Sequence, residues 1–343
     1  MAAKQRFVLS TQKQMATSGE APELHRVVCA IDSNMVFPLA VLVSSMCKSG
    51  TKPFRLTLGY LDGTLPETAR EYLATIFSHL GIAADFLNLD NDARFITQGH
   101  ISPTTFAKFL LGDAISDQHL WLDADTVVLP GWDGIFDEIA TASSAEGLVV
   151  ALRGSDASAS ASANPSDLPF NAGVLGWPQG KRRDWQAPLA SLTVVDTQEQ
   201  YLFNLLYSQT AKWVSENFNT LTYRLNKLNR LDLPFIVHYA GPHKPWHLVP
   251  SLRHRCLLHD CPWVAWFEAE AAFLISVSDT ELLTPTRRYR VGAVSSGRLQ
   301  WGRESSGYRL LRLLQWLGPL AKPLVGLLSL GRRWIPRGTH PLH

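Results

Sequence analysis

The sequence predicts an α/β protein in which a largely parallel, doubly wound sheet carries helices on both faces. Short apolar runs alternate with segments of helical spacing over the first 125 residues, a pattern typical of strand–helix–strand units. The chain has 343 residues, of which 46% are hydrophobic and 18% charged. That composition supports a large buried core and excludes a generally disordered protein. No internal repeat is visible.

Strands and helices are expected to alternate along this region. The strands cover residues 26–32, 54–60, 82–89 and 119–123, each a short apolar run. The helices cover residues 38–48, 66–80 and 103–115. Pro66 suits the first turn of its helix, because the N–H that proline lacks has no partner there. A Ser- and Ala-rich stretch at 155–166 predicts a flexible loop.

Charge and composition divide the chain into three regions: a flexible N-terminal arm (1–24), the main domain (25–286) and a basic, Leu-rich C-terminal tail (287–343). Of the 32 basic and 30 acidic residues, eleven and one lie in the tail, whose net charge is +10. The remaining 21 basic and 29 acidic residues give residues 1–286 a net charge of −8. The tail therefore requires an anionic partner or a solvated position.

An anionic membrane surface is the partner that the tail fits best. Residues 308–334 interleave Arg and Lys with Leu and Trp, as in short helices that lie on a membrane. The longest uncharged runs, 313–321 and 323–331, are nine residues each, too short to span a bilayer. A helix packed on the core is the alternative. No nucleic-acid partner is expected, because the tail offers few aromatic rings for base stacking.

Four cysteines in a chain of this size indicate a reducing compartment rather than a disulfide framework. The polar N-terminus contains no apolar core long enough for a secretory signal. We therefore expect a cytoplasmic protein, peripheral on the inner face of the membrane if the tail binds there. The cluster His254, Cys256, His259 and Cys261 offers four potential zinc ligands, but its spacing matches no common zinc site, so an ordinary loop is favoured.

Asp123 and Asp125 form the most informative local feature, a D-x-D at the end of the apolar run that begins at His119. Because side chains alternate along a strand, both carboxylates can point the same way while Ala124 points away. Two hard oxygen ligands at this spacing suit a divalent cation, and such a cation suits a diphosphate. A solvated Asp-rich turn is the alternative.

Further motifs follow in a fixed order along the chain. They are A-I-D-S-N at 30–34, H-I-S-P at 100–103, F-N-A-G-V at 170–174, E-Q at 199–200 and H-Y-A-G-P-H-K-P-W at 238–246. This order resembles the family 8 retaining glycosyltransferases, most closely the bacterial lipooligosaccharide galactosyl- and glucosyltransferase type, over about residues 25–250. The resemblance implies a GT-A type nucleotide-diphospho-sugar transferase fold and makes residues 25–286 a glycosyltransferase domain.

The resemblance assigns Asp123, Asp125 and His238 as ligands of a metal ion. Two carboxylates and one imidazole favour Mn²⁺, with Mg²⁺ as the alternative. Such an ion acts as a Lewis acid on the donor diphosphate. Lys244 and the backbone N–H of Gly241 are expected to contact the same diphosphate. For His238 the alternative is a core histidine, and for Lys244 a solvated charge.

The remaining donor-binding residues also come from the resemblance. Asp32 and Asn34 are expected to bind uracil and ribose, with Ala30 contributing backbone contacts. Met35 stands where the family usually has an aromatic ring. For Asp32 the alternative is a turn-forming residue. His100 and Ile101 precede the helix that carries Lys108. The family commonly has Arg at the Lys108 position, where it contacts the donor phosphate or sugar. The sugar pocket is expected to include Asn171, Ala172 and Gly173.

Glu199 and Gln200 correspond to a family Asp-Gln pair, and we expect them to be catalytic. The Glu199 carboxylate would hold hydroxyls of the transferred sugar, and the Gln200 amide would lie beside the anomeric carbon. Because an amide is a poor nucleophile, front-face attack is favoured, with the Gln200 carbonyl dipole steadying the positive centre. An exposed first turn of a helix is the alternative. Arg153, with Asp156 nearby, stands where the family often has an acceptor-binding Asp.

The predicted function is metal-dependent transfer of a hexose, galactose or glucose, from a UDP-sugar to a glycan or glycolipid acceptor. The alternative is a nucleotide-sugar-binding protein of the same fold with weak or lost transfer activity. Met35, Lys108 and Glu199 motivate that alternative, because each departs from the family pattern.

Overall fold

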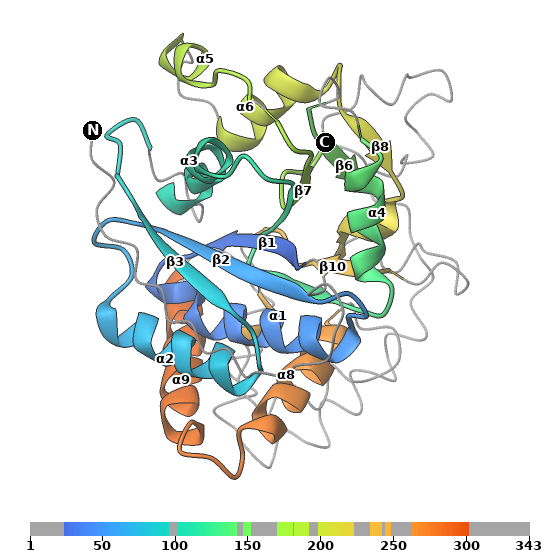
Figure 1. The fold of residues 1–343 in the computed structure, drawn as a ribbon. Helices are drawn as coiled ribbons and strands as arrows, with labels where there is room; N and C mark the ends of the chain where they lie inside the picture. Colours follow the sequence, from blue (N-terminus) through green and yellow to red (C-terminus); the bar gives the residue numbers. More distant parts are fainter. Residues whose placement is uncertain are drawn as a thin grey trace, which may run out of the picture.

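A mixed seven-stranded sheet forms the centre of the protein (Figure 1). This computed structural model describes residues 24–95, 102–142, 147–151, 170–180, 182–191, 198–222, 234–241, 244–247 and 263–301. The sheet order is β3-β2-β1-β4-β7-β6-β8. Its strands are β1 (His25–Ala30), β2 (Phe54–Leu61), β3 (Ala84–Leu89), β4 (His119–Leu122), β6 (Val149–Ala151), β7 (Val174–Trp177) and β8 (Lys212–Val214).

The first four strands in sequence are all parallel to one another. β1 pairs with β2 on one side and with β4 on the other, and β2 pairs with β3. β7 runs antiparallel to both β4 and β6, while β6 and β8 are parallel. The predicted fold class, an α/β protein with a largely parallel sheet, is confirmed, with β7 as the antiparallel strand.

Helices cover both faces of the sheet (Figure 1). On one face α1 contacts α2, α8 and α9, and on the other face α3 contacts β1 and β2. The apolar core on the α3 side also takes side chains from α5 and α6. The helices are α1 (Val36–Ser49), α2 (Glu67–His79), α3 (Ala107–Ala114), α4 (Ile135–Ala140), α5 (Gln186–Ser191), α6 (Gln198–Tyr207), α8 (Val264–Ser276) and α9 (Leu283–Trp301).

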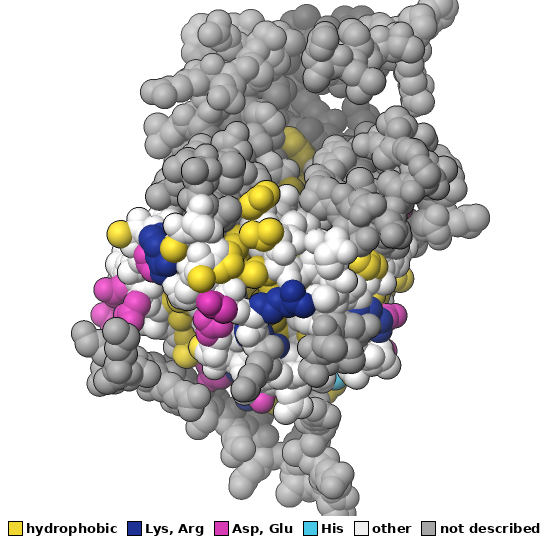
Figure 2. All heavy atoms as spheres, turned by 90° about the horizontal axis from the view of Figure 1, so that it is seen from above, with side chains coloured by type: hydrophobic (Ala, Val, Ile, Leu, Met, Phe, Trp, Pro, Cys, Tyr) yellow, Lys and Arg dark blue, Asp and Glu magenta, His cyan; other side chains and the backbone are white. Residues whose placement is uncertain are grey.

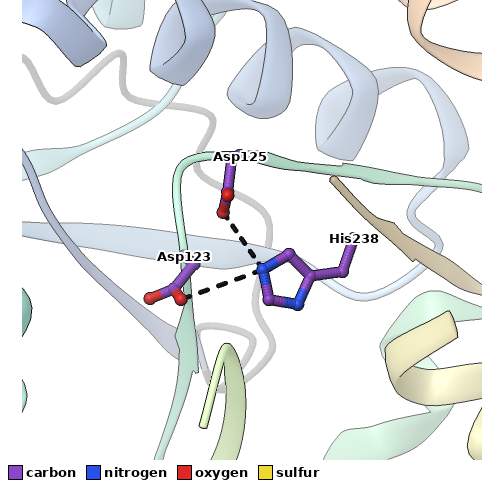
Figure 3. Close-up of side chains that lie close together, drawn as sticks. All are labelled: Asp123, Asp125 and His238. Carbon is purple, nitrogen blue, oxygen red and sulfur yellow. Dashed lines mark ion pairs between the residues drawn. The ribbon is translucent and has the colours of Figure 1, made fainter. Parts of the chain in front are cut away.

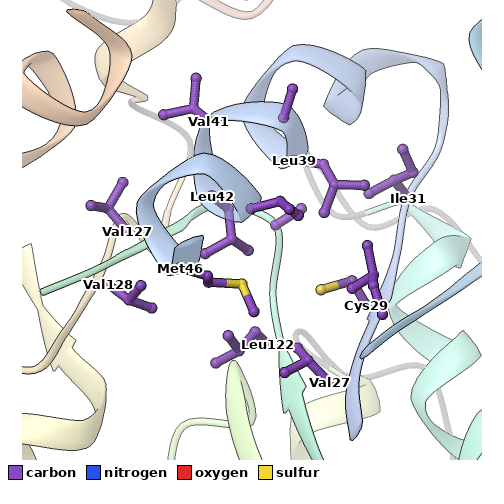
Figure 4. Packing of buried hydrophobic residues seen from close by; sticks show 14 of the residues in the cluster. Val27, Cys29, Ile31, Leu39, Val41, Leu42, Met46, Leu122, Val127 and Val128 are labelled. Carbon is purple, nitrogen blue, oxygen red and sulfur yellow. The ribbon is translucent and has the colours of Figure 1, made fainter. Parts of the chain in front are cut away.

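Strand side chains alternate between two apolar cores. On β1, Val27 and Cys29 join the core beneath α1, whereas Val28 joins the core on the α3 side. Figure 4 shows side chains of α1 packed around Val27, Cys29 and Leu122. On β4, Leu122 faces α1 and Trp121 faces α3. The alternation predicts that Asp123, the next residue, faces the α3 side as Trp121 does.

A second, three-stranded sheet joins the main sheet at the end of β4. Its order is β5-β10-β9, with β5 (Thr126–Val128), β9 (Thr220–Leu221) and β10 (Ile236–His238). β10 is antiparallel to β5 and parallel to β9. β10, more than 100 residues downstream of the D-x-D, therefore lies beside it, and β9 lies on the other side of β10.

Small differences from the predicted boundaries have local causes. The first strand ends at Ala30 rather than at residue 32, because Asp32 caps a short 3-10 helix (Ser33–Met35) and its Oδ1 accepts from the Asn34 N–H at 2.9 Å. The helix expected at 103–115 begins as a 3-10 turn (Pro103–Phe106) and continues as α3.

Several predicted features lie outside the described residues: nearly all of the N-terminal arm, the 155–166 loop, the His254–Cys261 cluster and the tail from residue 302. The expected start of the tail, residue 287, falls within α9. In that helix Tyr289 packs on Tyr72, and the Arg290 Nε donates to buried Glu270 at 2.7 Å. Within the described ranges, none of the helices combines the length and apolar character needed to cross a bilayer.

Candidate active site

The two aspartates of the D-x-D lie in the turn that links β4 to β5. The Asp123 N–H donates to the Gly173 carbonyl at 2.8 Å, which continues the β4–β7 ladder by one residue. Thr126 closes the turn, because its N–H and its hydroxyl both donate to the Asp123 carbonyl, at 3.2 and 2.8 Å. The backbone thus holds both carboxylates at the C-terminal edge of β4, where doubly wound sheets bind their ligands.

His238 reaches this turn from β10. Its register partner on β5 is Thr126, and the N–H of the next residue, Tyr239, donates to the Asp125 carbonyl at 2.9 Å. Figure 3 shows the imidazole pointing between the two carboxylates. The Nε2 atom is 3.2 Å from Asp125 Oδ1 and 4.0 Å from Asp123 Oδ2.

These three side chains have a donor set that fits a divalent cation. One ligand atom from each of Asp123, Asp125 and His238 lies within 4.8 Å of the others. A cation about 2.1 Å from each ligand holds neighbouring ligand atoms about 3 Å apart and opposite ones about 4.2 Å apart. The observed separations fall near this range. Oxygen and imidazole ligands suit Mn²⁺ and Mg²⁺ better than soft metals.

Gly173 leaves the space that the His238 ring occupies. A Cβ atom at position 173 would lie 2.1 Å from His238 Cε1 and 2.6 Å from Nδ1. Contacts below 3 Å are essentially never seen for a real Cβ, so any other residue would displace the imidazole. The glycine of the F-N-A-G-V motif is therefore required by the position of His238.

Lys244 places a positive charge on the opposite side of Asp125. Its Nζ lies 2.5 Å from Asp125 Oδ2 and also donates to the Tyr239 carbonyl at 2.7 Å. Burial alone would raise the pKa of the Asp125 carboxyl, but Lys244 and His238 hold that pKa well below its usual range. Gly241, at φ +97°, makes the turn between His238 and Lys244 with a conformation that favours glycine.

Lys108 is a buried cation on the α3 side of Asp123. Its side chain is 2% exposed, and its Nζ lies 3.1 Å from Asp123 Oδ1 and 2.5 Å from Glu199 Oε1. Burial opposes charge on Lys108, but the two carboxylates raise its pKa above its usual value, so the ammonium stays charged. Lys108 therefore links one candidate metal ligand to the first turn of α6.

The F-N-A-G-V segment is bound to the same helix. Asn204 of α6 accepts from the Phe170 N–H at 2.7 Å and donates to the Phe170 carbonyl at 2.9 Å. Asn171 Nδ2 donates to Gln200 Oε1 at 3.0 Å. Consequently Gln200 is held by Asn171 beside β7, and Glu199 by Lys108 of α3.

The chain matches a known protein family over most of the described residues. A family model described as glycosyl transferase family 8 matches residues 26–249, about two thirds of the chain. The chain belongs to glycosyltransferase family 8. The family assignment predicted from the motifs is thereby confirmed, and so is the prediction of a glycosyltransferase.

Solved structures show the same GT-A-like fold for this family 8 glycosyltransferase. The galactosyltransferase LgtC, solved with donor and acceptor sugar analogues, matches with a TM-score of 0.53 and 22% identity over 72% of this chain and 95% of LgtC. An active-site Gln-to-Glu variant of LgtC gives 0.56 and 20% over 77% and 99%. GlyE of Streptococcus pneumoniae gives 0.50 and 18% over 79% and 64%.

A curated relative matches over a shorter part of the chain. Glycosyltransferase GlyB of Streptococcus pneumoniae is 25% identical in an alignment of 180 positions that covers 46% of this chain and 41% of GlyB. The match thus spans less than half of either protein.

Most of the predicted site residues of this glycosyltransferase lie together at one edge of the sheet. Around the three candidate metal ligands the structure places Lys108, Asn171, Gly173, Glu199, Gln200 and Lys244. Ala172 is buried in the α3-side core, and Ala30 packs against that core. Their roles in donor binding and catalysis stay predictions.

The predicted nucleoside residues lie beyond the end of the neighbouring strand. β1 and β4 are parallel neighbours, so Asp32 and Asn34 belong to the same sheet edge as Asp123. Asp32 acts as a helix cap and Asn34 is exposed. His100, Ile101, Arg153 and Asp156 lie outside the described residues.

Sequence reasoning missed three polar side chains of the site. Trp121 Nε1 donates to Asp123 Oδ1 at 2.9 Å, and alternation along β4 could have identified it. Asn204 and Asn219 carry no local signature, because their partners are distant in sequence. Asn219 contacts both His238 and Asn171.

Proposed function

We propose that this enzyme transfers a hexose, galactose or glucose, from a UDP-sugar to a glycan or glycolipid acceptor, with retention of the anomeric configuration. The single observation that supports it most is the group Asp123, Asp125 and His238 at the C-terminal edge of β4. A divalent ion there, Mn²⁺ or alternatively Mg²⁺, would supply Lewis-acid stabilisation of the departing diphosphate.

The charges around this group support an anionic donor. Lys244 is held beside Asp125, within reach of any phosphate that shares a cation with that carboxylate. It acts as a point charge and can leave one oxygen partner for another. Among the described residues, apart from Gly241 and its two chain neighbours, no atom lies within 4 Å of the position that a Cβ would take at Gly241, which leaves room for a phosphate oxygen near its backbone. Asp32, Asn34, Ala30, His100 and Ile101 are proposed for the nucleoside.

The first turn of α6 is proposed to act on the transferred sugar. Gln200 Oε1 accepts one hydrogen bond from Asn171 and keeps a second lone pair for the anomeric region. Glu199 is buried with Lys108 as its partner, so its part is to orient rather than to attack. We propose front-face attack, in which the leaving diphosphate accepts the proton of the acceptor hydroxyl.

An acceptor with apolar or ring surfaces is supported by the face that carries α3, α5 and α6. Figure 2 looks onto this face and shows apolar side chains gathered near its middle. On α6, Tyr201 and Leu205 are 49% and 56% exposed, although both are large and hydrophobic. Exposed apolar surface of this kind commonly marks a binding site.

The test of this function is UDP release by the purified full chain over a panel of UDP-sugars, with and without Mn²⁺. We expect release with UDP-galactose or UDP-glucose, loss of release after chelation, and recovery when Mn²⁺ is added back. NMR of the product is expected to show the anomeric configuration of the donor. Undiminished release after chelation would contradict the metal site, and tight UDP binding without release from any donor would favour a binding protein without transfer activity.

We further propose that the basic tail holds this enzyme, as a cytoplasmic protein, against an anionic membrane surface. Arg287 and Arg288 open the tail as exposed residues of α9, and Val291 beside them is 64% exposed. The full chain is expected to sediment with vesicles that contain anionic lipid and to be released by salt. Equal sedimentation with neutral vesicles would contradict an electrostatic attachment.

A further inference from the structure

Asn219 lies between the candidate metal ligands and the candidate catalytic amide. It ends the short 3-10 segment Glu216–Asn219, just before β9, and is 7% exposed. Its Oδ1 is 3.0 Å from His238 Nδ1. Its Nδ2 is 3.2 Å from the Asn171 carbonyl and 3.0 Å from Asn171 Oδ1. One amide thus joins two segments that carry site residues.

The direction of these hydrogen bonds follows from one backbone group. The Asn171 carbonyl can only accept, so the NH₂ of Asn219 must face Asn171. Asn219 Oδ1 must then face His238, and because this oxygen can only accept, Nδ1 of His238 must carry the hydrogen. The other ring nitrogen, Nε2, is the one that faces Asp125 and Asp123.

This arrangement is the one that a metal-binding histidine requires. A ligand imidazole presents a lone pair to the ion and donates its other N–H to a neighbour, which fixes the ring and its tautomer. In this protein Asn219 is that neighbour. With the hydrogen on Nδ1, Nε2 of His238 and the carboxylate oxygens converge on one point, where a cation bound through the Nε2 lone pair would satisfy all of them.

Hydrogen-bond directions between Asn171 and α6 are fixed in the same way. The Gly173 N–H donates to Asn171 Oδ1 at 3.0 Å, so this oxygen is an acceptor and the NH₂ of Asn171 faces Gln200. Gln200 must therefore turn its carbonyl oxygen towards Asn171. A single directed chain, in which each residue donates to the next, runs from His238 through Asn219 and Asn171 to Gln200.

We propose that Asn219 is a positioning residue that holds His238 in its metal-binding tautomer and, through Asn171, sets the orientation of the Gln200 amide. This inference rests on the proposed function, because it assumes a cation at His238 and a role for Gln200. The pairing of β9 with β10 brings Asn219 close to His238. Thr220 lies opposite Val237 and Leu221 opposite His238, and Asn219 directly precedes Thr220.

Two substitutions separate the contact of Asn219 with His238 from its contact with Asn171. In Asn219→Leu the new side chain has a volume similar to that of Asn, and the hydrogen bonds to both His238 and Asn171 are lost. Asn219→Asp keeps an acceptor for His238 Nδ1 but removes the donors to Asn171. It also places a carboxylate close to two oxygens of Asn171, the backbone carbonyl and Oδ1. Thr220→Val is the matched control, because Thr220 is buried beside Asn219 and the substitution removes a neighbouring half-buried hydrogen bond, from Thr220 Oγ1 to the Glu216 carbonyl at 3.1 Å.

Binding of Mn²⁺ is measured directly by the electron paramagnetic resonance signal of the free ion, and kcat and KM are measured beside it. Asn219→Leu is expected to weaken Mn²⁺ binding about 10- to 100-fold, as removal of a ligand's hydrogen-bond partner does. Asn219→Asp is expected to bind Mn²⁺ as tightly as the wild type or more tightly, with kcat lowered about tenfold or more and KM little changed. Thr220→Val is expected to match the wild type in both measurements.

The outcomes distinguish this inference from the proposed function. Wild-type protein that binds no Mn²⁺ would end the proposed metal site itself. Wild-type protein that binds Mn²⁺ while Asn219→Leu binds it equally well would overturn the role of Asn219 alone. A merely structural role would lower Mn²⁺ affinity in step with thermal stability and would not give Asn219→Leu and Asn219→Asp different metal affinities. Parallel losses of Mn²⁺ affinity and thermal stability in Asn219→Leu, Asn219→Asp and Thr220→Val would therefore also overturn the positioning role of Asn219.

Discussion

Replacing Asp125 by alanine is expected to lower sugar transfer at least about 1000-fold, equivalent to about 4 kcal/mol of transition-state stabilisation. The carboxylate lies between His238 Nε2 at 3.2 Å and Lys244 Nζ at 2.5 Å, so its loss removes a proposed metal ligand and releases Lys244. Initial rates of UDP release at saturating donor and Mn²⁺ provide the measurement.

Two further variants make the Asp125 result interpretable. Asp125→Asn preserves the shape of the side chain and removes its charge, and a loss comparable to that of alanine would assign the effect to the charge. Asp92→Asn is the control, because Asp92 is a carboxylate paired with Arg94 at 2.6 Å, outside the candidate site. Transfer at the wild-type rate by a folded Asp125→Ala protein would end the metal assignment.

Replacing Lys108 by methionine is expected to have the largest effect on stability, a fall of about 3–5 kcal/mol in the free energy of unfolding. The substitution keeps most of the apolar stem and removes the ammonium. Glu199, 7% exposed, then loses its cation, and Asp123 loses a partner at 3.1 Å. Urea unfolding followed by circular dichroism provides the measurement, and sugar transfer is expected to fall as well.

The matched control for Lys108 is a lysine whose partner is exposed. Lys52 pairs with Asp137, whose side chain is 76% exposed, and Lys52→Met is expected to cost about 0–1 kcal/mol. Adding Glu199→Gln to Lys108→Met is expected to recover part of the lost stability, because it removes the uncompensated buried charge. If Lys108→Met fails to fold, Lys108→Arg, which keeps the charge, is expected to fold. Unchanged stability of Lys108→Met would contradict a charged buried pair.

The elements of the first 125 residues were predictable because their signals are local. Each of the first four strands is a short apolar run. The intervening helices begin and end within two residues of their predicted bounds, except that α3 begins four residues later, after a 3-10 turn. The end of the first strand moved by two residues, to Ala30, because the Asp32 side chain captures the backbone of the turn and ends the strand early. Capping of this kind competes with strand continuation and is decided by the residues that follow.

The pairings beyond β4 were not predictable in the same way. β7 enters the sheet antiparallel between β4 and β6, and β10 turns away to pair with β5. These strands are only three or four residues long, and their registers depend on partners elsewhere in the chain. Because His238 is delivered by β10, its place beside the carboxylates follows from that pairing.

By itself the sequence determined the α/β class, membership of glycosyltransferase family 8 and the pair of aspartates at a strand end, because periodicity and short motifs are properties of neighbouring residues. Only the tertiary structure decided that the Lys108 ammonium lies on Asp123 and Glu199, and that Asn219 directs His238 and Asn171. Lys108 lies 15 and 91 positions from Asp123 and Glu199, and Asn219 lies 19 and 48 positions from His238 and Asn171. The direction of the Asn219 hydrogen bonds is imposed by the Asn171 carbonyl, which only folding brings to that amide.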